Sequence, residues 1–177
     1  MQKLNLPKPT HNDCSEYFFT YINKVPEGNV LELFRSQVSD FKEELGKLTE
    51  EQSRFRYAEG KWSIREVLGH IIDTERIFAS RSLHFARNEK QPLVAFDQDA
   101  YMKNVNFHER NLAELLAELE AVRNSITLLF ESYTEKMWQN VGHTTETKFA
   151  NFSIPYILVG HLIHHLAVIR EKYFTKF

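Results

Sequence analysis

His161 and His165 are the two residues whose type and spacing best suit chemistry. A helical repeat of about 100° per residue places their side chains about 40° apart, with Cβ atoms roughly 5–6 Å apart. Both imidazoles can therefore bind one metal ion at about 2.0–2.1 Å. An imidazole pair without a metal would need polar partners, and burying polar groups without them is costly. The surrounding face instead carries aliphatic residues: Ile154, Ile157, Leu158, Val168 and Ile169.

A transition metal in a helical core needs a third ligand from a facing helix, and His70 is the best candidate. It shares the margin of an apolar face with Val67, Thr74 and Phe78. His84 is 14 residues later, about 21 Å along a helix axis, and cannot share a metal with His70. A core-facing histidine is more often structural than ligating, and the chain has eight histidines. From the residues alone, a three-histidine metal site and a set of structural histidines both remain open.

The segments that must position these histidines are helical. Apolar residues recur every three or four positions in four segments, which predicts helices over 29–48, 63–88, 108–133 and 153–174. Ser63 and Glu66 form a predicted capping box, and Ser153 is a predicted cap. No segment alternates with period two. The sequence therefore predicts an all-α four-helix bundle with long connections at 89–107 and 134–152. Nineteen extended residues reach about 60 Å, so either connection could cross the bundle and leave its flanking helices parallel.

Length and composition indicate one domain. The chain has 177 residues, which suits a single core. Residues 1–28 are predicted to be an irregular extension packed on the bundle, with a short helical turn in CSEYFFTYI, and residues 29–177 form the bundle itself. The N-terminus has no apolar stretch typical of a secretory signal. The single cysteine, Cys14, suits a cytoplasmic protein.

Charge and hydropathy argue against two classes of partner. Lys and Arg number 22 against 24 Asp and Glu, so no electrostatic footprint for nucleic acid is expected. Residues 149–169 contain no Asp, Glu, Lys or Arg and are long enough to span a bilayer. However, they include Asn151, Pro155 and three histidines, and polar groups in hydrocarbon are costly. We interpret this stretch as a buried helix and expect no membrane partner.

Three segments resemble the DinB-like (YfiT-like) superfamily of metal-dependent enzymes: Trp62–Asp73, Phe96–Tyr101 and Gly160–His165. The resemblance covers residues 30–175. It implies a four-helix bundle with up-down-down-up connectivity. It also implies a metal held by one histidine of the second helix and an HxxxH pair of the fourth. Carried over, the ligands are His70, His161 and His165, and His164 becomes a neighbour.

Three functions are compatible with such a site, and the expected partner of the two enzymatic ones is a small-molecule substrate. The first is hydrolysis by activated water, on zinc or nickel, since imidazole suits both. The second is transfer of a low-molecular-weight thiol, a role known for some members of the superfamily. Arg76, Arg81 or Lys103 could hold such an anionic thiol. The third is a metal-stabilised or partner-binding bundle without turnover. Because ligands must be neutral, we expect metal affinity to fall below about pH 6.5.

No general acid or base can be assigned from the sequence. Glu66 is the expected capping-box partner of Ser63. Asp73 is expected to be a surface carboxylate or to hydrogen-bond one of the metal ligands. Asp97 and Asp99 suit turns but could approach the metal. The remaining candidates for the pocket are Thr74, Tyr101 and His164, and the aromatic residues Trp62, Tyr101 and Trp138 could line a pocket or the face of a homodimer.

Overall fold

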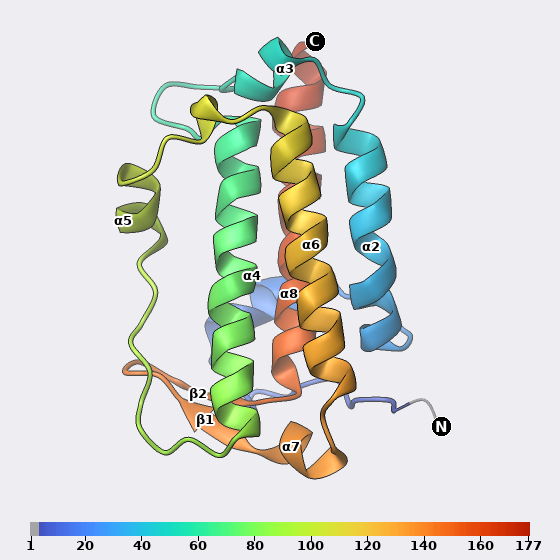
Figure 1. Cartoon of the computed structure of the whole chain (residues 1–177), viewed down its shortest axis with the longest axis vertical. Coiled ribbons are helices and arrows are strands. Elements are labelled where there is room, and N and C mark those ends of the chain that lie inside the picture. The colour runs from blue at the N-terminus through green and yellow to red at the C-terminus, as the bar shows by residue number, and fades with distance from the viewer. Residues whose placement is uncertain (1–3) are drawn as a thin grey trace.

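Four long helices form the body of the protein. The computed structural model describes residues 4–177, so the first three residues of the predicted extension lie outside the described part. The long helices are α2 (Val30–Leu45), α4 (Ile64–Ala86), α6 (Leu112–Glu131) and α8 (Ser153–Val168). In chain order they run up, down, down and up (Figure 1). The predicted all-α bundle and its connectivity are confirmed.

The parallel pair α4 and α6 requires a crossover, and the segment between them provides it. Residues 87–111 climb the outside of the bundle along α4 (Figure 1). They contain helix α5 (Gln98–Lys103) and the 3-10 turn η2 (Phe107–Glu109). The short helix α3 (Glu50–Arg54) lies in the connection between α2 and α4. The long connection predicted at 89–107 is therefore the one that crosses the bundle between α4 and α6.

The other long connection stays at one end of the bundle. It contains α7 (Glu135–Gln139) and a hairpin of β1 (Val141–His143) and β2 (Lys148–Ala150), with Gly142 opposite Phe149. The sequence analysis did not predict this hairpin. Each strand has only three residues, too few for an alternating pattern to be visible. Gly142 is required because a Cβ there would lie 1.7 Å from the Phe85 ring.

The helix ends agree in part with the predicted caps. Ser63 and Glu66 form the expected capping box. Helix α6 also begins at a capping box, made by Asn111 and Glu114, four residues beyond the predicted start. Ser153 does not cap α8, because its hydroxyl donates to the Ala150 carbonyl at 2.7 Å. The last helix continues as a π-helix, Ile169–Tyr173, and a 3-10 turn, Phe174–Lys176.

In the part of the chain that the structure describes, the core contains one ion pair whose two side chains are both buried. Arg123 of α6 and Glu75 of α4 are both fully buried, with Arg123 Nε 2.9 Å from Glu75 Oε2. Arg123 also donates to the Phe34 carbonyl of α2 at 2.9 Å, so it joins three helices. Residues 153–162 of α8 are all buried, as predicted for the charge-free stretch. Among residues 4–177, no helix has both the length and the hydropathy that a membrane crossing needs.

The N-terminal segment lies against α8 and the hairpin. It contains the 3-10 turn η1 (Glu16–Phe18) and α1 (Phe19–Ile22), at the position of the predicted helical turn. The Tyr156 hydroxyl donates to the Leu6 carbonyl at 2.9 Å. A Cβ on Gly160 would lie 2.2 Å from the Tyr21 carbonyl oxygen. Glycine therefore lets α1 approach α8 directly beside His161.

Candidate metal centre

Three imidazoles meet between α4 and α8. His70 Nε2 lies 3.1 Å from His161 Nε2, and His165 Nε2 lies 3.0 Å from the same atom. One ligand atom of each residue lies within 4.8 Å of the other two. His70 and His161 are buried and His165 is half-buried. The structure thus brings together the three residues singled out from the sequence.

These imidazoles are held neutral. Burial lowers the pKa of His70 to about 4, and His164 acts in the same direction. Burial lowers the pKa of His161 well below its usual value, and the neighbouring imidazoles lower it further. The pKa of His165 is lowered for the same reasons. Neutral imidazoles expose nitrogen lone pairs, which are what a metal requires.

The donor set fits a divalent transition metal. Two nitrogens bound to one ion at about 2.0–2.1 Å stand roughly 3.0–3.4 Å apart at near-tetrahedral angles, and the observed separations of 3.0 and 3.1 Å are close to this. Three protein ligands leave a further coordination position open, as in catalytic zinc sites. The Nδ1 atom of His70 is buried without a hydrogen-bond partner, so nothing in the described chain fixes its tautomer.

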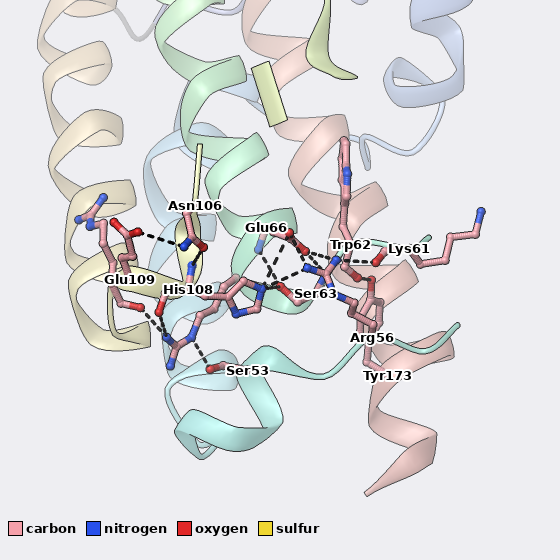
Figure 2. Close-up of polar contacts among 12 residues, drawn as sticks. Ser53, Arg56, Lys61, Trp62, Ser63, Glu66, Asn106, His108, Glu109 and Tyr173 are labelled. Carbon is pink, nitrogen blue, oxygen red and sulfur yellow. Dashed lines mark hydrogen bonds and ion pairs between the residues drawn. The ribbon is translucent and has the colours of Figure 1, made fainter. Parts of the chain in front are cut away.

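The end of α4 that carries His70 is fixed by a polar network (Figure 2). Arg56 donates to Glu66 Oε1 at 2.7 Å, and Ser63 N donates to Glu66 Oε2 at 2.6 Å. His108 Nε2 lies 3.3 Å from Ser63 Oγ. Both carboxylate oxygens of Glu66 are therefore engaged at the helix start.

Trp62 covers one side of His70. The two rings have centroids 5.0 Å apart. The Tyr173 hydroxyl donates to the Trp62 carbonyl at 2.6 Å, which connects the end of the last helix to this loop (Figure 2). Gly69 allows the Phe107 ring to contact α4 directly, since a Cβ there would lie 2.2 Å from that ring.

A cavity of about 370 Å³, here called the main cavity, opens onto the cluster. His70, Thr74 and His161 lie in its wall, and the rest of the wall comes from residues 15–21, 78–81, 95–98, 144–149 and 157. Thr74 is buried, and its hydroxyl has no hydrogen-bond partner in the described chain. The volume falls within the range of small-molecule sites.

A second cavity of about 290 Å³ adjoins the same cluster from α8. His164 and His165 line it together with Trp62 and Asp99. His164 is half-buried and its ring lies 5.4 Å from that of Tyr21. The cluster thus contributes residues to the walls of two cavities.

The remaining predicted residues lie outside the main cavity. Asp73 is half-buried, and burial raises its pKa. Asp97 caps α5 by accepting from the Asp99 and Ala100 amides at 3.0 Å. Tyr101 is 47% exposed and contacts Phe96. Trp138 is not at a pocket or an outer face, because it is buried in the core.

Of the three basic residues considered from the sequence, one reaches the site. Arg81 lines the main cavity and is only 7% exposed. Arg76 pairs with Glu118 at 2.6 Å instead, and Lys103 is exposed on α5.

Sequence reasoning missed the contribution of the N-terminal segment and the hairpin. Tyr21 places its ring 5.1 Å from that of His161, and Phe18 and Tyr17 line the same cavity. Thr144 and Glu146 do so from the turn between β1 and β2. The aromatic run EYFFTYI was the only available signal, because it is unusual for an irregular extension.

The chain belongs to the DinB superfamily, whose family model matches residues 33–169. A comparison with curated protein sequences finds no match.

Two solved structures share the fold. YfiT from Bacillus subtilis, described as a probable metal-dependent hydrolase with an unusual four-helix bundle topology, is similar with a TM-score of 0.76 and 17% identity. The likeness covers 86% of this chain and 90% of YfiT. A mycothiol-dependent maleylpyruvate isomerase is similar with a TM-score of 0.66 and 13% identity, over 82% of this chain and 61% of that one.

Proposed function

We propose that this member of the DinB superfamily is a metal-dependent hydrolase that acts on a small molecule. Its one divalent ion, zinc or nickel, would be held by His70, His161 and His165. The observation that carries the proposal is the convergence of three neutral Nε2 atoms, with His70 and His161 in the wall of the main cavity and His165 in the wall of the second. The description of YfiT as a probable metal-dependent hydrolase supports it.

The chain's own residues would bind and orient the substrate beside that ion. A divalent ion with three neutral ligands keeps its full charge and lowers the pKa of a bound water or thiol. Burial raises the pKa of Tyr21, so its hydroxyl stays protonated and can donate a hydrogen bond. The unpartnered Thr74 hydroxyl can donate or accept one. The aromatic wall of Phe18, Phe78 and Phe149 would exclude water from the substrate.

A second candidate function is thiol transfer, and the two cavities favour it. A transferase must hold a thiol and an electrophile at the same time, and the main and second cavities both reach the histidine cluster. The mycothiol dependence of the similar isomerase supports a thiol role. A metal-stabilised bundle without turnover is the third candidate, and substrate access through two cavities argues against it.

The first experiment measures metal content. Protein purified without a histidine tag should contain about one equivalent of zinc or nickel. His165→Ala should lose the metal, whereas its neighbour His164→Ala should keep it. Retention of stoichiometric metal by a triple alanine variant of His70, His161 and His165 would refute the ligand assignment.

The second experiment separates the three functions. Ester, amide and lactone substrates are tested alone, and electrophiles are tested with low-molecular-weight thiols. A hydrolase loses turnover on chelation and regains it when metal is added. The His161→Ala variant should be inactive, whereas His143→Ala, which changes an exposed histidine, should stay active. Thiol-dependent loss of the electrophile without hydrolysis would replace the hydrolase by the transferase. Stoichiometric metal with no turnover in either panel would leave the structural role.

A further inference from the structure

Unsatisfied polar atoms gather along one face of α4. In the described chain, four buried side-chain nitrogen or oxygen atoms have no hydrogen-bond partner, and three of them are His70 Nδ1, Thr74 Oγ1 and Arg81 Nε. With about 100° per residue, residues 74 and 81 lie about 40° and 20° from residue 70 around the helix axis. All three residues line the main cavity. Buried polar groups are normally paired, so their concentration in one cavity indicates a ligand.

Arg81 is the most informative of the three. It is 7% exposed, and it forms no ion pair with any carboxylate of residues 4–177. Its guanidinium lies 4.9 Å from the Phe78 ring and 5.9 Å from the Phe149 ring. Glu146, an exposed residue at the cavity rim, is the carboxylate that acts on its charge. A buried arginine without a direct ion pair carries a large desolvation cost, which a bound anion would offset.

Resting on the proposed function, we infer that the substrate carries a carboxylate that pairs with Arg81, and an apolar, preferably aromatic, body that contacts Phe18, Phe78 and Phe149. Arginine presents a planar fork that matches a carboxylate in two hydrogen bonds. These three phenylalanines belong to the apolar part of the cavity wall, together with Ala95, Phe96 and Ile157. Thr74 then hydrogen-bonds a polar group of the substrate next to the histidine cluster.

The helix geometry also sets the length of this substrate. Residues 70 and 81 are separated by about 16 Å along the axis of α4. Long helical side chains lean toward the N-terminus, and this holds for His70 as well as Arg81, so the span between their end groups is only somewhat shorter than the axial separation. The carboxylate and the reacting group must therefore lie at opposite ends of the molecule, separated by a ring and a few methylene groups.

The test uses binding, not turnover, so that it is independent of the metal. Metal is removed by chelation, and 4-phenylbutyrate and its neutral amide are titrated by calorimetry. The acid should bind at least tenfold more tightly than the amide. Arg81→Met, which keeps the side-chain length, should lower the affinity for the acid at least tenfold and leave the amide unchanged. Arg81→Lys should recover part of the loss, and Glu146→Gln should tighten binding of the acid.

Arg87→Met is the matched control, because Arg87 lies at the end of the same helix but does not line the cavity. It should bind acid and amide as the wild type does. Unfolding midpoints of all variants verify that the fold is intact. Equal binding of acid and amide, or an acid affinity that Arg81→Met leaves unchanged, would overturn the inference. If the protein bound no metal but still bound the acid more tightly than the amide through Arg81, only the proposed metal-dependent function would be refuted.

Discussion

The burial of His70 predicts how the stability of the metal-free protein depends on pH. The pKa of His70 is about 4 in the folded chain and about 6.5 in the unfolded chain. Since the folded pKa is the lower one, the unfolded chain takes up a proton first as the pH falls. Stability is therefore full above pH 6.5 and is lost progressively between pH 6.5 and pH 4.

The size of this effect follows from the two pKa values. Between pH 8 and pH 5, linkage through His70 alone lowers the free energy of unfolding by about 2 kcal/mol. For a chain of this length this corresponds to a fall of about 4–8 °C in Tm. His161 and His165 act in the same direction, because their pKa values are also lowered.

Urea unfolding of chelated protein at pH 8, 6.5 and 5 measures the effect. His70→Gln removes one titrating group, so its free energy of unfolding should fall by about 2 kcal/mol less than that of the wild type over this range. His143→Gln, which changes an exposed histidine of β1, should behave as the wild type. Identical slopes for wild type and His70→Gln would show that burial does not keep His70 neutral, and the reasoning would be wrong.

Three further predictions concern the cluster and its supports. Metal affinity should stay nearly constant from pH 7.5 to about pH 5 and fall below that pH, because the folded pKa of His70 is about 4. This range is lower than the ordinary pKa of histidine suggests. A competitive chelator assay at each pH measures the affinity, and a fall that begins at pH 6.5 would contradict the prediction. Glu75→Ala leaves Arg123 charged and unpaired in the core, which should cost about 3–5 kcal/mol in urea unfolding; a loss under 1 kcal/mol would mean that Arg123 finds another partner. Gly160→Ala pushes the Tyr21 carbonyl away from α8, so it should cost about 1–3 kcal/mol and weaken metal binding; unchanged calorimetric titrations would show that α1 does not position His161.

Helical periodicity was sufficient to predict the bundle and to select the three histidines, but it left open whether they form a metal site. The pair His161 and His165 falls on one face at any helical register, and His70 lies on the core margin of a helix whose start is marked by Ser63 and Glu66. These are local properties of the sequence, so a pattern with period 3.6 reveals them. Periodicity alone did not predict the connectivity, because two connections were long enough to cross the bundle. In the structure, residues 87–111 are the connection that crosses it.

The walls of the cavities could not be predicted, because they depend on contacts between distant segments. Tyr21 reaches His161 only through the close approach that Gly160 allows. Phe149 reaches Phe85 and Arg81 only because the hairpin folds beneath α4. The burial of Arg81 follows from these contacts, and nothing in its local sequence distinguishes it from a solvated surface arginine.

This division between helices and connections has a functional consequence. The histidine cluster lies on α4 and α8, two long helices whose buried faces form part of the core. The walls that select the substrate come mainly from residues 15–21, 95–98 and 144–149, all outside the four long helices. Such connecting segments tolerate change more readily than core helices. Thr74, Phe78 and Arg81 of α4 and Ile157 of α8 are the exceptions. Because Arg81 lies on the same helix as His70, the distance between the anion site and the cluster is set by a single helix.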